Sequence, residues 1–380
     1  MRILLVVLNA QLTGGLETYS RDVAASLRRL GHEVAVLSLH ERPQAFPGWG
    51  DVPVRALAPR NPLLFRLYFR VRHWIAAWRL RRSRAMYDRV FVMHPYAAAA
   101  ARRAGVRYWV WTYGIEVWGA WPPQLEAGLR GAARVLAISA HTAQAVQRRL
   151  PGAQVDVVRP VVDTARFAPA RPPRQPTPPF RLLTVGRLAA DERYKGHEMV
   201  IRNLDAITRR VGAPVAYWIA GDGDDRPRLE RAAQRHGVAD KVRFLGRVPD
   251  DQLAATYQAC DVFVMPSVAA QRPDGSWMGE GFGIVYLEAS ACGKPVVGSD
   301  TGGGVDAVED GVTGFCIDPT SDAALVGAVA RLLLEPGLAR RMGEAGRQRV
   351  AAHFAHAALD RRMAALIGDD PCAASPASSA

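Results

Sequence analysis

The stretch Ala168–Phe180, APARPPRQPTPPF, divides this 380-residue sequence into two parts of similar length and pattern. It holds six prolines in thirteen residues. Proline fixes φ and has no N–H to donate, so a run of prolines is extended and semi-rigid and typically connects domains. A chain of this length also suggests about two domains. We therefore predict a domain boundary within this stretch.

The part before the boundary alternates short apolar runs with helical patterns. Continuous apolar runs of this kind are typical of strands buried on both faces, as in a parallel sheet. A Gly-Gly turn at Gly14 and Gly15 leads into a helix that Gly31 ends. We expect strands near residues 2–8, 32–39, 89–93, 107–114, 134–139 and 155–163.

The part after the boundary repeats the alternation, and its last helical pattern has a break near His353. We expect strands near 180–188, 215–223, 241–248, 261–267, 295–300 and 314–318. Strand-helix-strand repetition predicts the α/β class, with two doubly wound, Rossmann-like domains. Such sheets bind ligands beyond the carboxyl ends of their strands.

These patterns give the predicted domain limits. The first domain covers residues 1–168, a proline-rich linker covers 169–179, and the second domain covers 180–350. A helix at 351–368 is expected to pack back on the first domain. The small polar residues of the tail, 369–380, predict disorder.

The net charge of +13 is concentrated in the first part of the chain. Residues 1–170 contain 24 arginines, no lysine and 10 acidic residues, whereas the remainder carries 25 basic and 26 acidic residues. A genome bias toward arginine explains the scarcity of lysine but not the scarcity of acids. We interpret the asymmetry as a sign of an acidic partner surface.

The remaining totals indicate a folded protein of a reducing compartment. The composition is 49% hydrophobic and 22% charged, which suffices for two cores. The four cysteines have no C-x-x-C spacing, so we expect neither disulfides nor a zinc site. We expect no secretion signal and no membrane-spanning segment.

One segment of the second part combines two carboxylates with a glycine-rich turn. Glu280 and Glu288 flank the turn Gly281-Phe282-Gly283, and an apolar helical pattern begins at Ile284. Backbone N–H groups at a helix start lack partners and carry the positive end of the dipole, which suits phosphates and polar sugar edges. Carboxylates can accept hydrogen bonds from sugar hydroxyls. The alternative is that both glutamates are ordinary surface residues.

Other loops that follow strands of the second part add cations and glycines. VGRLAADERYKGHE places Arg187 and Lys195 where a diphosphate would lie. Gly221 permits close approach of the backbone, and the main chain of Arg247 and Val248 could contact a base. The alternative is a solvated loop with scattered charges.

These motifs resemble those of retaining glycosyltransferases of the GT-B fold, in glycosyltransferase family 4. The E-x7-E segment EGFGIVYLEASACGKPVV carries the resemblance, and VGRL…YKG, AGDG, FLGRV, CDVFVMPS and TGGGVDAVEDGVTGF stand in the family's order. The sequence looks most like α-mannosyltransferases that use GDP-mannose and act on phosphatidylinositol mannosides. Users of UDP-sugars share the motif, so UDP-glucose, UDP-GlcNAc or a dTDP-sugar remains an alternative donor.

The resemblance implies a division of labour between two domains that face each other across a cleft. The first domain would bind the acceptor and the second the nucleotide-sugar donor. Arg187, Lys195 and Glu280 would be the catalytic residues, with the two cations on the diphosphate and Glu280 on the donor sugar. Glu288 would contact the ribose. Further donor contacts would come from Gly14, Gly15, Gly221, Arg247, Val248, Gly281, Phe282, Gly283 and Ile284.

The resemblance also implies retention without an enzymic nucleophile, and no cofactor or metal beyond the donor itself. One position departs from the family: where many relatives carry His-Gly, this sequence reads WTYGIEVWG, with Tyr113 in the place of the histidine. A role for a histidine there is therefore in doubt. Tyr113 and Glu116 are candidate sugar or acceptor contacts. The surrounding tryptophans either assist them or cover a core edge.

The segment Arg60–Arg89 holds nine arginines, with five aromatic residues between 65 and 78. Its spacing places Arg66, Arg70 and His73 on one helical side, and Leu64, Tyr68, Val71 and Ile75 on another. This composition is typical of an interfacial amphipathic helix. We take Arg66, Arg70, Arg72 and Arg79 as candidate membrane contacts. We expect a cytoplasmic protein at the inner face of the cell membrane with a lipid-linked or glycan acceptor; the alternative is an ordinary surface helix.

Two other functional classes find little support. The pI of 10.2 would suit a nucleic-acid-binding protein, but no motif of that kind accompanies it. A nicotinamide-dependent oxidoreductase would carry G-x-G-x-x-G after the first strand, where this sequence reads NAQLTGGLE. We expect no nucleic-acid partner.

Overall fold

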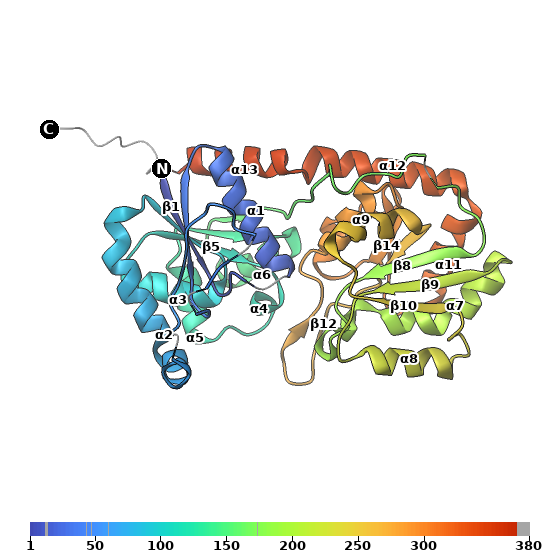
Figure 1. The fold of residues 1–380 in the computed structure, drawn as a ribbon, viewed down its shortest axis with the longest axis horizontal. Helices are drawn as coiled ribbons and strands as arrows, with labels where there is room; N and C mark the ends of the chain where they lie inside the picture. Colours follow the sequence, from blue (N-terminus) through green and yellow to red (C-terminus); the bar gives the residue numbers. More distant parts are fainter. Residues whose placement is uncertain (12–13, 43, 47, 60, 173, 371–380) are drawn as a thin grey trace. The chain divides into compact units, whose positions relative to one another are not determined.

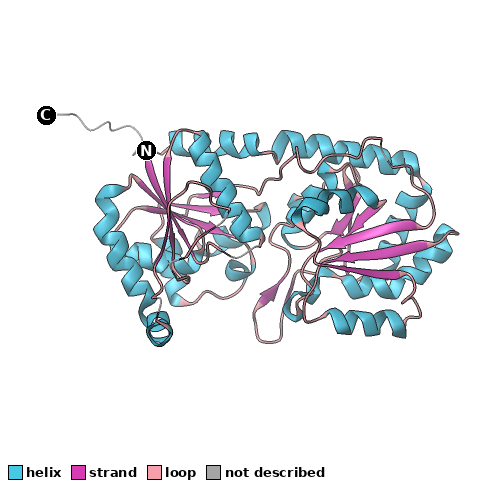
Figure 2. Cartoon of the chain, in the orientation of Figure 1, coloured by secondary structure: helices cyan, strands magenta, loops and turns pink. Residues whose placement is uncertain are grey.

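The computed structural model describes residues 1–370 except 12, 13, 43, 47, 60 and 173. The described chain divides into two compact units. The first unit contains Met1–Val161 together with the chain from His356 onward, and the second contains Val162–Ala355. Figure 1 follows the chain through both units, and Figure 2 shows the strands of each unit between layers of helices.

The described residues of the first unit form a seven-stranded parallel sheet in the order β3-β2-β1-β4-β5-β6-β7. The strands are β1 (Arg2–Val7), β2 (Glu33–Ser38), β3 (Val54–Ala56), β4 (Arg89–Val92), β5 (Tyr108–Thr112), β6 (Arg134–Ala137) and β7 (Val155–Val157). The predicted α/β class and its doubly wound sheet are confirmed. β3 was not predicted, because three residues at a sheet edge leave no hydrophobic pattern to detect.

Helices cover both faces of this sheet. They are α1 (Gly15–Arg29), α2 (Pro62–Ser83), η1 (Arg84–Met86), α3 (Pro95–Ala104), α4 (Ile115–Trp118), α5 (Pro123–Arg130), α6 (Ala140–Arg149) and α13 (His356–Gly368). The strands β4, β5 and β6 are buried along their whole length, as expected for strands covered on both sides. The four tryptophans near Glu116, namely Trp109, Trp111, Trp118 and Trp121, are all buried, so they belong to this core.

The described residues of the second unit form a six-stranded parallel sheet in the order β10-β9-β8-β11-β14-β15 and a small antiparallel hairpin. The sheet strands are β8 (Phe180–Val185), β9 (Val215–Ala220), β10 (Val242–Gly246), β11 (Val262–Val264), β14 (Val296–Ser299) and β15 (Gly314–Ile317). The hairpin consists of β12 (Ala270–Gln271) and β13 (Trp277–Met278).

Helices surround the sheet of the second unit, and an apolar cluster that includes Ile201, Leu204 and Ile219 joins some of them to it. They are η2 (Ala190–Lys195), α7 (His197–Val211), α8 (Arg226–Arg235), α9 (Asp250–Ala259), α10 (Ile284–Ala291), η3 (Gly302–Asp306), α11 (Asp322–Leu334) and α12 (Pro336–His353). α12 ends at His353, where the sequence predicted a break.

The division between the units lies earlier than the proline-rich stretch that predicted it. Residues 162–179 belong to the second unit. The Val162 N–H donates to the Phe354 carbonyl at 2.8 Å, and the Arg174 guanidinium pairs with Asp261. Sequence composition locates the extended segment, but tertiary contacts decide on which unit it packs.

The chain returns to the first unit through α13. The Arg29 guanidinium binds the Asp360 carboxylate with two hydrogen bonds of 2.8 Å each. The tail was predicted to be disordered from residue 369, yet the Asp370 side chain is fully buried and pairs with Arg89 at 3.1 Å and Arg107 at 2.8 Å. Ion pairing to residues far away in the sequence fixes this carboxylate. Residues 371–380 lie outside the described part of the chain.

Candidate functional site

The loop that follows β8 brings two predicted cations to a single carboxylate. Glu192, in η2, accepts hydrogen bonds from the Arg187 guanidinium and the Lys195 ammonium. The Lys195 residue is 8% exposed, whereas the Arg187 side chain is 74% exposed. Glu192 was not among the predicted site residues. Its spacing of three residues from Lys195 was a visible signal, since such pairs meet on a helical turn.

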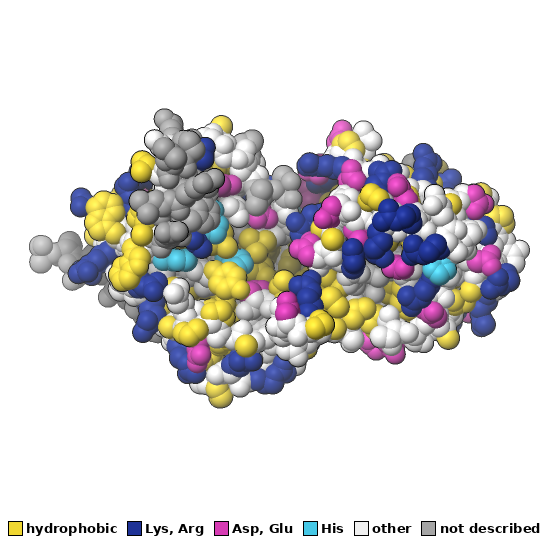
Figure 3. Space-filling view, turned by 90° about the horizontal axis from the view of Figure 1, so that it is seen from below, with side chains coloured by type: hydrophobic (Ala, Val, Ile, Leu, Met, Phe, Trp, Pro, Cys, Tyr) yellow, Lys and Arg dark blue, Asp and Glu magenta, His cyan; other side chains and the backbone are white. Residues whose placement is uncertain are grey.

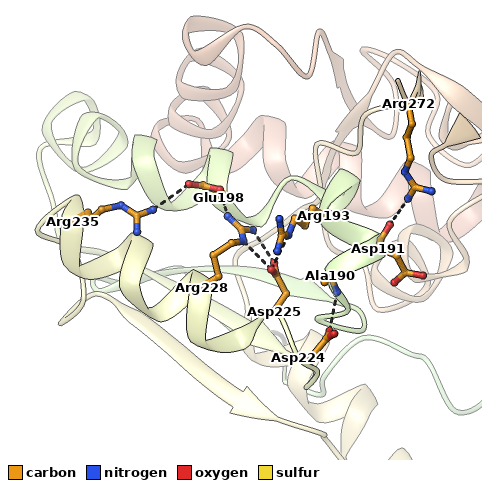
Figure 4. A network of polar contacts seen from close by, with 9 residues as sticks. All are labelled: Ala190, Asp191, Arg193, Glu198, Asp224, Asp225, Arg228, Arg235 and Arg272. Carbon is orange, nitrogen blue, oxygen red and sulfur yellow. Dashed lines mark hydrogen bonds and ion pairs between the residues drawn. The ribbon is translucent and has the colours of Figure 1, made fainter. Parts of the chain in front are cut away.

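A network of charged residues fixes this loop on the second unit (Figure 4). The Asp225 carboxylate, 3% exposed, accepts from Arg193 Nε at 2.8 Å and from two nitrogens of Arg228 at 2.8 and 2.7 Å. The Ala190 N–H donates to Asp224 at 2.8 Å. The η2 loop, and with it Lys195, is therefore held by the residues that begin α8.

The hairpin between β12 and β13 contacts the same loop. Arg272 donates to the Asp191 carbonyl at 2.7 Å, as Figure 4 shows, and the Val268 N–H donates to the Tyr194 carbonyl at 2.7 Å. The loop is thus supported by two elements that are far apart in the sequence. Such support lets a loop present fixed charges rather than mobile ones.

Gly221 allows the backbone behind Arg187 to pack closely. A Cβ at Gly221 would lie 1.8 Å from the Gly186 carbonyl oxygen, and its φ of 145° is in a region that side chains rarely adopt. Any other residue at 221 would push the strand end away from the cation loop. Arg247, which is exposed, and Val248 directly follow the end of β10. Gly221 and Gly246 are joined by a backbone hydrogen bond of 2.8 Å.

The Gly281-Phe282-Gly283 turn ends at the start of α10, as predicted. Gly283 has a φ of 84° and caps the helix, whose first residue is Ile284. The Gly303 N–H donates to the Glu280 carbonyl at 2.8 Å, and a Cβ at Gly303 would lie 1.8 Å from the Gly281 carbonyl oxygen. Ile284 is only partly buried, whereas Tyr286 and Leu287 of the same helix are buried.

Glu280 lies beside the cation loop. Burial raises the pKa of the Glu280 carboxyl, and the neighbouring Lys195 ammonium opposes that rise. A hydrogen bond from the Tyr194 side chain also lowers the pKa of the Glu280 carboxyl. Among the described residues, the buried oxygen Oε2 of Glu280 has no hydrogen-bond partner. A buried acceptor without a partner is costly, and a ligand hydroxyl would satisfy it.

Glu288 lies within α10 and occupies a different environment from Glu280. Its Oε2 accepts from the hydroxyl of buried Tyr257 at 2.6 Å. Burial raises the pKa of the Glu288 carboxyl, and the Tyr257 hydrogen bond and the Arg166 guanidinium oppose that rise. The Tyr257 contact holds the Glu288 side chain in one orientation.

In the first unit, Gly14 caps α1 and Gly15 is its first residue. Residues 12 and 13, just before them, lie outside the described residues. The Glu41 carboxylate, beyond the end of β2, accepts from the Ala10 N–H at 2.6 Å and the Gln11 N–H at 2.7 Å. Glu41 thereby fixes the first part of the loop that leads from β1 to the two glycines.

Tyr113 and His94 stack at the ends of β5 and β4, with ring centroids 6.0 Å apart. Burial lowers the pKa of His94 to about 4, so the imidazole is neutral near pH 7. Sequence reasoning looked for a histidine only after β5 and missed His94. The signal was the His-Pro pair between β4 and α3, in which His94 is the N-cap of α3.

Glu116 supports the turn of the chain around it. Its carboxylate accepts from the Tyr113 N–H. Burial raises the pKa of the Glu116 carboxyl, and backbone N–H groups of this turn oppose the rise. Sequence reasoning did not anticipate this structural role.

The basic helix α2 exposes an apolar stripe on its outer side. Leu64, Val71, Trp74 and Trp78 are 38–66% exposed and lie three, four or seven residues apart. The predicted faces are therefore partly wrong: Tyr68 is 3% exposed and its hydroxyl donates to the Leu39 carbonyl at 2.5 Å. Packing against the rest of the unit, which periodicity cannot identify, chose the inward side.

Arginines accompany this stripe. Arg79 is exposed and Arg72 is half-buried, while the side chains of Arg66 and Arg70 lie outside the described residues. The guanidinium groups of Arg79 and Arg82 lie 5.3 and 4.9 Å from the ring centroid of Trp78. Figure 3 shows hydrophobic side chains among basic ones on the surface of the first unit.

Within the described residues, none of the helices is long and apolar enough to cross a bilayer. The same part of the chain brings together no three His, Cys, Asp or Glu residues that could hold a metal ion.

Comparison with protein families matches both parts of the chain. Residues 13–166 match the model described as Glycosyltransferase Family 4, and residues 169–349 match the model described as Glycosyl transferases group 1. A GDP-mannose-dependent alpha-(1-6)-phosphatidylinositol monomannoside mannosyltransferase of Mycolicibacterium smegmatis is 35% identical over 285 residues, which cover 70% of this chain and 72% of that protein. A D-inositol 3-phosphate glycosyltransferase of Salinispora arenicola is 33% identical, over 56% of this chain and 48% of its own length.

Solved structures share the fold. Sucrose-phosphate synthase from Thermosynechococcus elongatus has a TM-score of 0.76 at 23% identity and covers 97% of this chain and 98% of its own. Anabaena HepE in complex with UDP and glucose has a TM-score of 0.73 at 20% identity, over 97% and 99% of the two chains. With both units matched by sequence and by structure, the chain belongs to glycosyltransferase family 4 and is a hexosyltransferase of the GT-B fold.

Proposed function

We propose that this enzyme transfers mannose from GDP-mannose, with retention of configuration, to a lipid-linked or glycan acceptor at an anionic membrane surface. The second unit binds the donor and the first unit the acceptor. No metal takes part; Arg187 and Lys195 supply the positive charge. The enzyme would serve glycolipid or polysaccharide synthesis at the inner face of the cell membrane.

The observation that carries the donor site is the position of Glu280 beside Lys195. Its buried, unpartnered Oε2 offers an acceptor for a sugar hydroxyl, and the neighbouring ammonium offers a counter-charge for a phosphate. A nucleotide-sugar joins these two groups through the bond between its anomeric carbon and its diphosphate. The arrangement therefore suits a donor whose reacting bond lies between Glu280 and the cation pair.

The departing nucleoside diphosphate would be bound by Arg187 and Lys195, which share the carboxylate of Glu192. Two cations that share one carboxylate carry a net charge of +1. Their attraction to the diphosphate would grow as negative charge develops on it during the reaction. Fixed cations of this kind stabilise a transition state more than a ground state. The charged network of Figure 4 fixes the η2 loop before the donor binds. Little reorganisation of the loop is therefore required during the reaction.

Retention is proposed to proceed on one face of the sugar. The bond between the anomeric carbon and the β-phosphate oxygen breaks, and the acceptor oxygen bonds to the same face. The acceptor proton passes to the departing phosphate oxygen. His94 is neutral near pH 7 and lies in the first unit beside Tyr113, where it would orient the acceptor by hydrogen bonding.

The relatives support the choice of mannose and GDP, since those of 35 and 36% identity are named GDP-mannose-dependent mannosyltransferases. The exposed stripe of α2 supports the membrane surface. Tryptophans beside arginines suit the boundary between headgroups and acyl chains, and no acidic residue occurs within α2.

Thermal shift with GDP, UDP and dTDP tests the donor, because a ligand that binds only the folded state raises Tm. GDP should raise Tm most, and Glu288→Ala should weaken that shift through loss of a ribose contact. A larger shift with UDP or dTDP would exclude GDP-mannose as the preferred donor.

The reaction itself is tested with GDP-mannose and a phosphatidylinositol-based acceptor in the presence of EDTA. Unchanged turnover is expected, and NMR should show the α-configuration in both donor and product. Abolition of activity by EDTA, or an inverted product, would refute the corresponding part of the proposal.

A further inference from the structure

The first unit contains a cavity of about 350 Å³ between α2 and the edge of the sheet. Leu4, Ala35 and Leu37 line it from β1 and β2, and Leu80 and Ser83 line it from the last turns of α2. Its volume falls in the range of small-molecule sites. The donor and acceptor residues discussed above do not line it, so it is a separate feature of the unit.

Most residues that line the cavity are apolar, and its charged residues are basic. Leu4, Leu37 and Leu80 are buried, with 5%, 7% and 1% of their surface exposed. Arg55 and Arg79 also line it, and both are exposed. Among the described residues that line the cavity, none is acidic. An occupant would therefore combine an apolar body with an anionic end.

Arg79 links this cavity to the outer stripe of α2. Its guanidinium lies 5.3 Å from the Trp78 ring centroid, and Trp78 is 52% exposed. Arg79 and Leu80 thus line the cavity directly beside the tryptophan that the proposed membrane surface would contact. Trp78 of the exposed stripe is therefore followed directly in α2 by Arg79 and Leu80, which line the cavity.

We propose that this cavity binds one acyl chain of an anionic phospholipid, with the chain against Leu4, Leu37 and Leu80 and the phosphate at Arg79 and Arg55. A lipid is preferred to a soluble anion because most of the lining residues are apolar, and each buried methylene favours binding. It is preferred to a neutral lipid because both charged residues are cations. The proposal is independent of the donor and of the transfer reaction.

Such a site would make membrane binding by the enzyme stronger and dependent on the lipid that is present. A tryptophan stripe alone gives reversible contact with the surface, as does a single lipid anchor. A chain drawn out of the bilayer into the protein adds a second, specific contact. The enzyme would then favour bilayers that supply an anionic lipid, beyond the general attraction of its positive charge.

Calorimetric titration of the full chain, free of nucleotide, with a single-chain phosphatidylglycerol below its micelle concentration tests the proposal. Binding at one site per protein is expected. The headgroup alone, glycerophosphoglycerol, should bind at least tenfold more weakly, as should a monoacylglycerol of the same chain length. Equal binding of the headgroup would indicate an anion site without a chain pocket and would overturn the proposal, as would absence of binding.

Variants locate the site. Ala35→Met and Ser83→Leu fill the cavity from opposite walls and should each weaken lipid binding at least tenfold, and Arg79→Gln should weaken it severalfold. Trp74→Ser, on the outer stripe, should leave binding of the single-chain lipid unchanged while weakening adsorption to phosphatidylglycerol vesicles. Wild-type affinity in both filled variants, with Tm retained, would place the lipid elsewhere. Should one of them unfold, the other still decides.

Discussion

His94 stacks on Tyr113 with their ring planes inclined by only 22°, although the two residues follow different strands. The His94 Nδ1 accepts a hydrogen bond from the Tyr96 N–H at 3.3 Å. A neutral imidazole that accepts at Nδ1 carries its proton on Nε2. His94 is therefore a neutral hydrogen-bond donor at this edge of the sheet.

This environment predicts how stability depends on pH. The folded-state pKa of His94, about 4, lies below the ordinary value of 6.5, so the unfolded chain binds the proton more readily. The contribution of His94 is complete above about pH 6.5 and is lost as the pH falls toward 4. His94→Gln should reduce the loss of Tm between pH 7.5 and pH 5. The exposed His236→Gln serves as control; identical slopes in wild type and His94→Gln would refute this assignment.

Removal of a cation should slow the transfer. Lys195→Ala should lower kcat by about 10²–10³-fold, the loss typical of one electrostatic donor in a transition state. Lys241→Ala is the matched control, since its ammonium pairs with Asp205 at 3.3 Å, away from the loop. Single-turnover kinetics with GDP-mannose measures both. A change in KM alone would mean that Lys195 contributes only to binding.

Glu192→Gln should affect stability and ligand binding in opposite directions. Loss of the buried carboxylate leaves Lys195 without its partner, which costs about 3–5 kcal/mol in typical buried pairs. The same change leaves both cations free for a diphosphate, so the Kd of GDP should fall by about tenfold. Urea unfolding and calorimetry measure the two effects. Weaker binding of GDP would show instead that Glu192 orients the cations.

Asp225→Asn should act through the loop rather than through direct contact with a ligand. Charged hydrogen bonds from Arg193 and Arg228 are weakened, at about 1.5–3 kcal/mol each. We expect a lower Tm and a higher KM for the donor. Asp205→Asn, which perturbs an exposed ion pair with Arg209, is the control. A donor KM equal to that of wild type would mean that the loop keeps its position without the network.

Asp370→Ala should destabilise the first unit. The fully buried carboxylate pairs with two arginines, and Arg89 is itself 8% exposed. Removal of one partner of a buried pair typically costs about 3–5 kcal/mol. Asp369→Ala is the neighbouring control. Equal denaturation midpoints for the two variants would show that the Asp370 pairs contribute nothing to folding.

Much of the fold followed from local sequence. The apolar runs 2–8, 89–93 and 180–188 each became a parallel strand, because burial on both faces requires continuous apolar residues. Gly283 and the break near His353 marked helix ends. These features depend on neighbours within a few residues, so periodicity and turn chemistry suffice to read them.

The tertiary structure decided what depends on residues far apart in the sequence. Sequence spacing grouped Tyr68 with Leu64, but packing buries Tyr68 and leaves Leu64 exposed. Glu192 between two cations, His94 against Tyr113 and Asp370 against Arg89 each required a neighbour that only the folded chain supplies. A hydrophobic or polar pattern indicates which side chains tend to be buried or hydrogen-bonded. Which partner each side chain contacts is determined only by the packed chain, because these contacts form between elements rather than along one element.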